Sequence, residues 1–314
     1  MAYEHETKAG ASMASPVLQN IIEMIKAQPL REGMPFEEVR ANFERLSEIY
    51  PVADDVKREK AGPAGIPGEW ITPPGVSDDI TVYYLHGGGY TIGSVNTHVR
   101  MISLIAAAAG ARAYAIDYRL APEHPFPAGL DDAVTGYRWL IEQGVDPARI
   151  VIAGDSAGGG LVLATLLRLR EAGDSLPAAA VLLSPWTDLE ATGESIKTRR
   201  EADPMIDPTG MPEMSRSYYG DEDVRNPLIS PLHADFSDLP PMLIQVGDAE
   251  VLLDDSTRVA RRARAAGVDI TLEVDDEMIH VFQFFAPLLP EAVAAIARIG
   301  EFAKSHAGAA AATR

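Results

Sequence analysis

From residue 80 to the C-terminus, short apolar runs alternate with longer segments whose apolar residues recur at helical spacing. The runs have the length of buried strands, and the longer segments have the length of helices. Regular alternation of this kind is typical of an α/β fold, a parallel sheet with helices on both faces. The expected strands are Ile80–Leu85, Ala113–Asp117, Ile150–Ala153, Ala179–Leu183, Met242–Val246 and Ile270–Val274, and the expected helices are Leu130–Gln143, Gly159–Ala172, Ser256–Ala266 and Pro290–Ala303.

Two segments depart from this alternation. Between residues 16 and 50 the apolar positions predict two helices, the first beginning at Ser15-Pro16 because serine caps a helix and proline suits its first turn. Later, Thr187–Pro240 is a long connection without a clear core strand. A connection of that length is usually functional, such as a lid over a site. Apolar residues in these two segments are expected to roof a pocket: Met13, Leu18, Met205, Met211 and Met214.

Composition narrows the function. The 314 residues include 27 Lys and Arg against 46 Asp and Glu, a net charge of −19, which disfavours nucleic acid and anionic membranes as partners. There is no cysteine, which excludes disulfides, thiolate metal sites and cysteine nucleophiles. Neither a signal-peptide pattern nor an apolar run long enough to span a bilayer is present, so a cytoplasmic location is expected.

The first chemical motif is Gly154-Asp155-Ser156-Ala157-Gly158, between an expected strand and an expected helix. A nucleophile on a sharp strand-to-helix turn needs small neighbours, and the turn exposes the serine hydroxyl. The amide of Ala157, at the amino end of the helix, can stabilise an oxyanion. The pentapeptide alone is weak evidence, because a glycine-rich turn can also serve only to pack a helix on the sheet.

The second motif is His86-Gly87-Gly88-Gly89, directly after an expected strand. Consecutive glycines let backbone amides approach a ligand, so two of these amides can complete an oxyanion hole with Ala157. The rival interpretation is a dinucleotide-binding turn, with Asp117 as the ribose-binding acid. Such a turn must open a helix at once, whereas the residues from Tyr90 to Val95 favour extended structure. His86 is expected to order the loop rather than to act as a base.

The remaining groups of a Ser–acid–His arrangement must follow the serine in the chain. His280 comes shortly after the last expected strand, where a general base belongs, although a satisfied core histidine is the alternative. The acid should follow Met242–Val246, and Asp248, Glu250 and Asp254 are all candidates. Asp254 and its neighbour Asp255 also suit capping of the next helix. No metal-ligand motif or phosphate loop is present in the sequence, so neither metal nor cofactor is expected.

Taken together, these motifs resemble the hormone-sensitive-lipase-like branch of the α/β-hydrolases, the bacterial family IV carboxylesterases. The resemblance rests on His86–Gly89, Asp117–Glu123, Gly154–Gly159, Ser184–Trp186 and the segment around His280. It implies a mostly parallel eight-stranded sheet with a helical cap. The cap would comprise an N-terminal segment, residues 1–55, and an insertion at about 187–226 in a catalytic domain of residues 56–314.

The resemblance also implies roles for individual residues. Ser156 would be the nucleophile and His280 the base, and the amides of Gly88, Gly89 and Ala157 would form the oxyanion hole. Most of the branch carries Asp-Pro-Leu at the acid position, whereas this chain has Glu250-Val251-Leu252. Glu250 is therefore the expected acid, in departure from the common pattern.

The predicted activity is hydrolysis of short- to medium-chain carboxylic esters through an acyl-enzyme intermediate. A lactone hydrolase with the same mechanism is the alternative within the enzymes, and a catalytically inactive binding protein of the same fold is the alternative outside them. A homodimer is expected by resemblance, because an uncovered last strand, Ile270–Val274, invites pairing.

Overall fold

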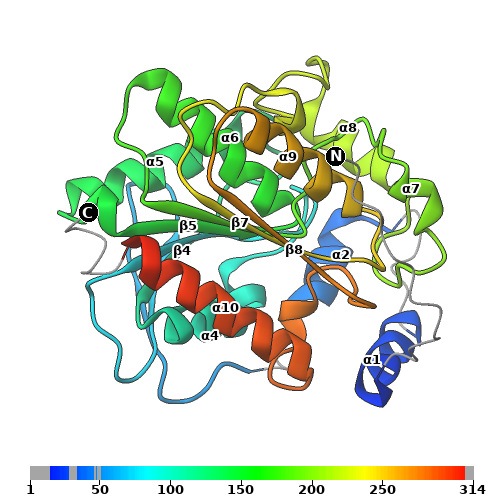
Figure 1. The fold of residues 1–314 in the computed structure, drawn as a ribbon, viewed down its shortest axis with the longest axis horizontal. Helices are drawn as coiled ribbons and strands as arrows, with labels where there is room; N and C mark the ends of the chain where they lie inside the picture. The colour runs from blue at the N-terminus through cyan, green and yellow to red at the C-terminus, as the bar shows by residue number, and fades with distance from the viewer. Residues whose placement is uncertain (1–14, 28–33, 46, 48–50, 308–314) are drawn as a thin grey trace.

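A single eight-stranded sheet organises the protein (Figure 1). The computed structural model describes residues 15–27, 34–45, 47 and 51–307. The strands lie in the order β1-β2-β4-β3-β5-β6-β7-β8; β1 and β2 are antiparallel to their neighbours, and β4 through β8 are parallel. The strand bounds are β1 Lys57–Lys60, β2 Gly68–Thr72, β3 Thr81–Leu85, β4 Arg112–Ile116, β5 Ile150–Asp155, β6 Ala179–Leu183, β7 Met242–Gly247 and β8 Ile270–Asp275.

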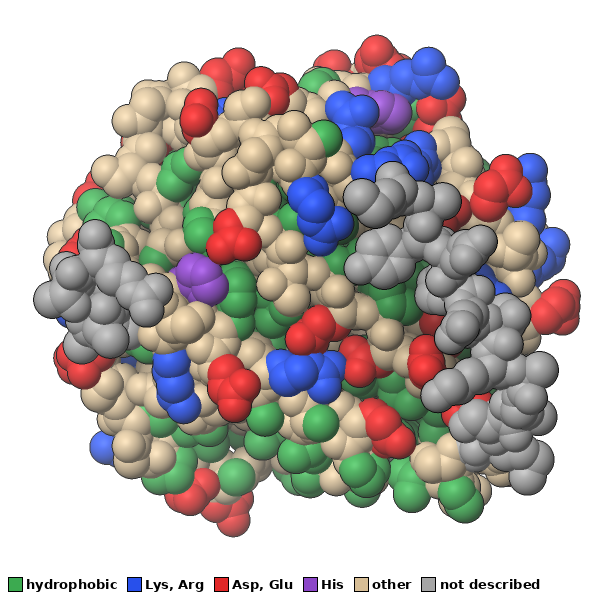
Figure 2. Space-filling view, viewed as in Figure 1, with side chains coloured by type: hydrophobic (Ala, Val, Ile, Leu, Met, Phe, Trp, Pro, Cys, Tyr) green, Lys and Arg blue, Asp and Glu red, His purple; other side chains and the backbone are tan. Residues whose placement is uncertain are grey.

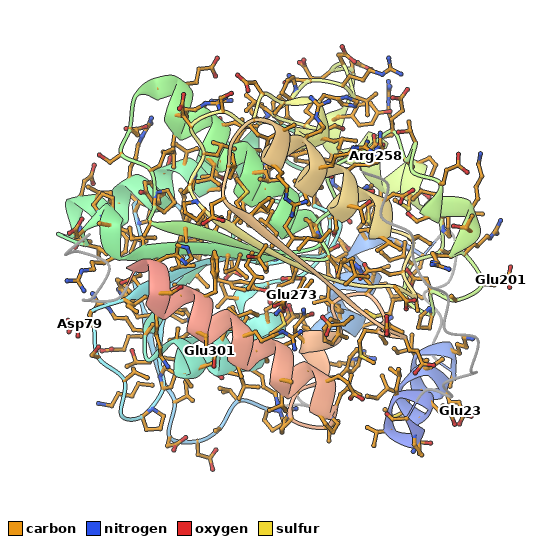
Figure 3. All side chains as sticks on the ribbon, viewed as in Figure 1. Glu23, Asp79, Glu201, Arg258, Glu273 and Glu301 are labelled. Atoms are coloured by element: carbon orange, nitrogen blue, oxygen red, sulfur yellow. The ribbon has the colours of Figure 1, made fainter. Side chains whose placement is uncertain are left out.

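Helices cover both faces of this sheet, which confirms the predicted α/β class. In Figure 1, α4 (Val95–Ala109) and α10 (Pro290–Ala307) lie below the sheet, and α5 (Ala128–Glu142), α6 (Ala157–Ala172) and α9 (Leu253–Ala265) lie above it. Alternate side chains of each strand enter opposite cores, because successive residues of a strand point to opposite faces. Tyr83 of β3 thus packs into the core with α5 and α6, while Val82 packs into the core with α4 and α10. Side chains fill the space between the layers (Figure 3).

Two elements differ from the expectation. Strand β1 consists of four charged, exposed residues and pairs only with β2, so no apolar pattern marked it. The extended structure expected from Tyr90 to Val95 is wrong, because Thr91 N–H and Ile92 N–H donate to the Gly88 carbonyl in a turn and α4 begins at Val95. Ser94 caps the helix by accepting from the backbone N–H of Thr97, and the Thr97 hydroxyl accepts from Ser94 N–H. This reciprocal capping box overrides the β-branched character of Val95.

The two segments expected to form a cap contain helices where the structure describes them. Helices α1 (Pro16–Ala27) and α2 (Phe36–Glu44) are in the N-terminal segment, and the Ser15 hydroxyl accepts from Leu18 N–H at 3.2 Å, as the predicted cap requires. Leu18 is fully buried in the core beneath the sheet rather than in a pocket wall. Met13 lies outside the described residues. The insertion contains α7 (Ser195–Thr198) and α8 (Met211–Tyr219).

Shorter elements complete the chain. Three 3-10 helices connect the main elements: η1 (Pro147–Arg149), η2 (Pro231–His233) and η3 (Phe282–Phe285). Helix α10 extends to Ala307, which is buried, so the end of this helix lies beyond the predicted Ala303. On the face shown in Figure 2, acidic side chains are distributed with basic ones among them rather than in one block. None of the described helices has the length and apolar character needed to cross a bilayer.

Candidate active site

Ser156 lies on the turn between β5 and α6, at the carboxyl end of the parallel strands. Its φ of 52° and ψ of −122° are a conformation that a residue with a β-carbon rarely adopts. The turn is held by the next strand's continuation: Ser156 N–H donates to the Leu183 carbonyl, and Trp186 N–H donates to the Ser156 carbonyl, both at 2.8 Å. A β-carbon on Gly158 would lie 2.1 Å from the Leu85 carbonyl oxygen. The small residues predicted here are thus required by the close approach of β3.

A buried carboxylate and a histidine meet next to this turn. Glu250, after β7, is fully buried, and its Oε2 lies 2.7 Å from Nδ1 of His280, in the loop after β8. The other oxygen, Oε1, accepts from the Ser184 hydroxyl and from the Gly247 N–H, each at 2.7 Å. The Ser184 hydroxyl in turn accepts from Val281 N–H at 3.1 Å. Both oxygens of Glu250 therefore accept hydrogen bonds or contact His280, and the loop that carries His280 joins the same hydrogen-bond network through Val281.

The charge of Glu250 decides the protonation behaviour of His280. Burial by itself lowers the pKa of this imidazole, because a low-dielectric surrounding disfavours the charged form. The charge and hydrogen bond of Glu250, with contributions from Asp203 and Asp155, outweigh burial and raise the His280 pKa above its usual 6.5. The Ser184 hydroxyl donates to Glu250, and the preceding residue, Leu183, accepts from Ser156 N–H, so the Glu250–His280 pair lies near the serine turn.

Nδ1 of His280 is occupied by Glu250, which leaves Nε2 as the nitrogen available to a nucleophile. Within the described residues, no hydrogen bond joins the Ser156 hydroxyl to His280. Such contacts often tighten only when substrate is bound. The structure thus brings His280 and Glu250 into direct contact and places Ser156 on the adjacent turn.

The other two candidate acids are used elsewhere. Asp248 Oδ1 accepts from Glu277 N–H at 2.7 Å, and Asp254 Oδ2 accepts from Ser195 N–H at 3.0 Å. The expectation that Asp254 and Asp255 cap the following helix is wrong, because α9 begins earlier, at Leu253, and neither side chain caps it. Their carboxylates instead bind backbone amides of the Thr187–Pro240 connection, as the Asp255 contact with Thr187 N–H shows.

The glycine loop after β3 offers backbone donors. Gly88 and Gly89 have φ of 114° and 59°, which favour glycine. In the described part of the chain, the amides of Gly88, Gly89 and Ala157 donate to no protein acceptor, whereas the Gly88 carbonyl accepts from Ile92 N–H at 2.9 Å. Three unpaired amides at the Ser156 turn and the adjacent glycine loop are donors that an oxyanion could bind.

A buried polar network supports this loop from behind. Asp155 Oδ1 accepts from the Tyr84 hydroxyl at 2.8 Å and from Gly87 N–H at 3.1 Å, and Oδ2 lies 3.3 Å from His98 Nε2. His86 Nδ1 lies 2.8 Å from the Gly87 carbonyl, and burial lowers the pKa of His86 to about 3. A neutral His86 with its ring in the loop fits the expected ordering role.

The contacts of Asp117 argue against the dinucleotide-binding interpretation. Its Oδ1 accepts from Val95 N–H at 2.7 Å, so this carboxylate binds the amino end of α4. The glycine loop is separated from α4 by the segment from Tyr90 to Ser94, whereas a dinucleotide turn opens its helix directly. The acid is therefore engaged inside the protein, and no ribose contact is needed to explain it.

Comparison with known proteins assigns the family. Residues 82–284 match the family described as alpha/beta hydrolase fold. This chain is an α/β-hydrolase. It is 41% identical to an acetyl-hydrolase of Streptomyces hygroscopicus over 94% of this chain and 99% of that protein. It is also 50% identical to a crystallised esterase of the bacterial hormone-sensitive lipase family, with a TM-score of 0.91 over 94% of this chain and 100% of that one. The resemblance to this branch and the eight-stranded fold are confirmed.

The α/β-hydrolase is 45% identical to EstE5, whose crystal was soaked with p-nitrophenyl butyrate, with a TM-score of 0.91 over 94% of this chain and 100% of that one.

Sequence reasoning missed several residues of this α/β-hydrolase site. Ser184 joins Glu250 to Val281. It belongs to the Ser184–Trp186 motif, so its position could be noticed in the sequence, but the partners of its hydroxyl could not be predicted from it. Asp155 lies inside the serine motif, yet its partners Tyr84 and His98 come from distant segments. Met214 is among the residues expected to roof the pocket, but its contact with Gly89 has no signal in the sequence: a β-carbon on Gly89 would lie 1.8 Å from the Met214 sulfur.

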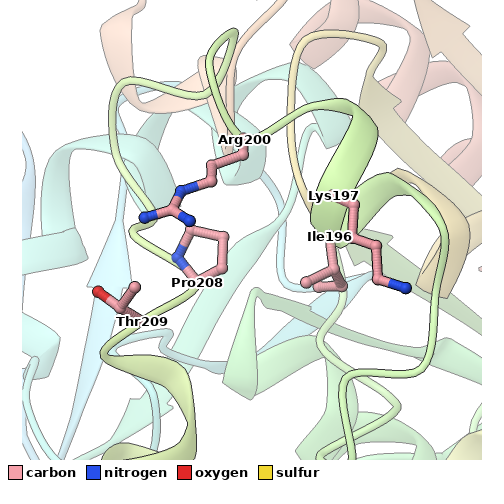
Figure 4. A pocket seen from close by; sticks show the side chains of 5 residues that line it. All are labelled: Ile196, Lys197, Arg200, Pro208 and Thr209. Atoms are coloured by element: carbon pink, nitrogen blue, oxygen red, sulfur yellow. The ribbon is translucent and has the colours of Figure 1, made fainter.

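Two further features of the α/β-hydrolase stand apart from these residues. Asp188, Glu190 and His233 bring donor atoms within 4.8 Å of one another, a grouping with no motif in the sequence. Arg258 already pairs with Asp188 and Arg225 with Glu190, so protein cations neutralise both carboxylates. The pocket in Figure 4, of about 390 Å³, is lined only by insertion residues and includes none of the candidate catalytic groups: Ile196, Lys197, Arg200, Pro208 and Thr209.

Proposed function

We propose that this protein is a serine carboxylesterase that hydrolyses short- to medium-chain carboxylic esters through an acyl-enzyme intermediate. The observation that carries the proposal is the buried Glu250–His280 contact beside the strained Ser156 turn. A carboxylate at Nδ1 selects the imidazole tautomer whose Nε2 can accept a proton, and it stabilises the imidazolium that forms. The raised pKa of His280 is the signature of that pairing.

In the proposed reaction, Nε2 of His280 takes the proton of the Ser156 hydroxyl as the oxygen attacks the ester carbonyl. The amides of Gly88, Gly89 and Ala157 hold the negative oxygen of the tetrahedral intermediate. His280 then protonates the departing alcohol. Water, deprotonated by the same imidazole, releases the acid from Ser156 in the second step.

The names of similar proteins support an ester substrate with a small acyl group. The relative from Streptomyces hygroscopicus is named an acetyl-hydrolase, and the EstE5 crystal was soaked with a butyryl ester. Carboxylic ester hydrolase is the class common to these names. We infer that the helices of residues 1–55 and of the insertion at about 187–226 form a cap that limits the acyl chain.

A labelling experiment tests the nucleophile. A fluorophosphonate should label the wild-type protein at Ser156, and Ser156→Ala should lose both labelling and ester turnover. Ser217→Ala, which changes a serine of the insertion, is the matched control and should behave as wild type. Labelling or near-normal turnover in Ser156→Ala would remove the proposal.

A substrate panel tests the reaction class. Nitrophenyl esters from acetate to octanoate should be hydrolysed faster than long-chain triglyceride emulsions. Lactones and anilides belong in the same panel, because a lactone hydrolase would use the same groups. Preference for a lactone over every ester would replace the proposed substrate, and absence of any turnover in a protein that folds would favour a binding protein.

A further inference from the structure

Helix α8 of the insertion rests directly on the glycine loop. The sulfur of Met214 occupies the position that a side chain on Gly89 would need, since a β-carbon there would come within 1.8 Å of it. One helical turn later, the ring of Tyr218 stacks on Tyr90 with centroids 3.8 Å apart and an interplanar angle of 10°. Residues four apart lie on the same helix face, so one face of α8 holds both contacts.

These contacts are anchored at both ends. The Tyr218 carbonyl accepts from Phe126 N–H at 2.8 Å, and the Tyr90 carbonyl accepts from Ala121 N–H at 2.9 Å. Tyr218 and Tyr90 are both buried, whereas Met214 is only half-buried. The aromatic pair therefore fixes the helix, and Met214, one turn earlier on the same face, is the less buried residue in contact with the loop.

The order of the strands says which part of a substrate meets Met214. Ser156 follows β5; the glycine loop follows β3 on one side of it, and Glu250 and His280 follow β7 and β8 on the other side. A departing alcohol must lie beside His280 to receive its proton. The carbonyl oxygen of the same ester binds at the glycine loop, and the acyl α-carbon, attached to the same carbonyl carbon and not beside His280, lies next to that oxygen and so near Gly89 and Met214.

We propose that Met214 determines which acyl groups the enzyme accepts, by restricting branching at the carbon next to the ester carbonyl. This inference rests on the proposed esterase function. The restriction is local, because the carbonyl oxygen bound near Gly89 and the acyl α-carbon are attached to the same atom. An unbranched acyl group extends past the thioether, whereas extra methyl groups on the α-carbon meet it. Branching, rather than chain length, is the property that Met214 controls.

The test compares nitrophenyl butyrate, isobutyrate and pivalate on wild type and Met214→Ala. Removing the thioether should raise the ratio of kcat/KM for pivalate to that for butyrate by about 10- to 200-fold, the range for one methylene of pocket space. Met214→Leu, of similar volume, should keep the wild-type ratio. Val293→Ala, which shortens an exposed apolar side chain of α10 outside both proposed cap segments, is the control and should also keep it.

The outcomes separate this inference from the proposed function. Fluorophosphonate labelling of Ser156 in each variant reports whether the nucleophile is active before any ratio is compared. If wild type labels and hydrolyses butyrate but Met214→Ala leaves the ratio unchanged, the role of Met214 is refuted and the esterase stands. If Met214→Leu changes the ratio as much as Met214→Ala, space next to the carbonyl is not the cause. If wild type neither labels nor turns over any ester, the proposed function itself fails.

Discussion

Replacing Glu250 by glutamine tests the proposed acid most directly, because the surrounding donors dictate how the amide must orient. Gly247 N–H and the Ser184 hydroxyl both donate to Oε1, and the backbone N–H cannot become an acceptor. The glutamine oxygen must therefore stay at the Oε1 position, and its NH₂ group must face Nδ1 of His280. An NH₂ donor at Nδ1 selects the tautomer that carries its proton on Nε2, which cannot accept a proton from Ser156.

The expected magnitude follows from this tautomer argument. The corresponding change in a serine protease costs about 10⁴ in turnover, so kcat for Glu250→Gln should fall by about 10²–10⁴, or about 2.7–5.5 kcal/mol of transition-state stabilisation. The fold should persist, since glutamine retains the volume and the two bonds at Oε1. Steady-state kinetics on one soluble nitrophenyl ester, with circular dichroism as the check of folding, measures the effect.

The pH profile provides a second readout. The base must be neutral to act, so activity of the wild type is lost as pH falls through the raised pKa of His280. In Glu250→Gln burial remains, which lowers the pKa of His280, while the charge of Glu250 that raises it is gone. The acid limb of the residual activity should consequently move to lower pH.

Two matched variants decide between the candidate acids. Asp248→Asn and Asp254→Asn change carboxylates of the same region that bind Glu277 N–H and Ser195 N–H, away from His280. Both should retain turnover within about tenfold of wild type if only the acid that orients the base matters. Near-normal turnover in Glu250→Gln together with collapse in Asp248→Asn would refute the reasoning and assign the role to Asp248.

Two further predictions concern the loop support and the assembly. Asp155→Asn should lower kcat by about 10- to 100-fold, less than outright loss of an oxyanion donor, because Gly87 N–H loses its anionic acceptor. The exposed control change, Asp131→Asn, should leave steady-state turnover unchanged. Equal effects of the two changes would contradict a role of Asp155 in supporting the glycine loop. Strand β8 is the edge of the sheet and Val274 is 41% exposed, so light scattering at micromolar concentration should give a dimer mass, and a monomer mass would reject edge pairing.

The sequence by itself determined the architecture, because burial leaves a periodic record. The strands around Ser156 are fully buried and mostly apolar, as β3, β5 and β6 show, so their apolar runs predicted them to within a few residues. The start of helix α4 was not predicted because the residues from Tyr90 to Val95 have side chains that favour strands. The capping box at Ser94 forms only after the chain has turned. Strand β1 was not predicted because it pairs with β2 through backbone hydrogen bonds, which do not depend on the type of side chain.

The residues of the candidate site were likewise predictable only in part. The residue types around Ser156, with Gly88, Gly89 and His280, could be read from motifs, because turns with positive φ and strand ends leave local marks in the chain. The choice among Asp248, Glu250 and Asp254 could not be made from the residues alone. These three carboxylates lie within seven residues of one another, and no local sequence pattern distinguishes them. Only the packing of this segment against the loop after β8 places one of them, Glu250, at His280.

Contacts between distant segments were decided by tertiary structure alone. Ser184 reaches Glu250 and Val281 across 66 and 97 residues of chain, and Asp155 reaches Tyr84 across 71. Met214 lies on Gly89 because the long connection folds back over the glycine loop. A hydrogen bond or a van der Waals contact depends on distance in space, and no periodicity along the chain encodes where two remote side chains meet.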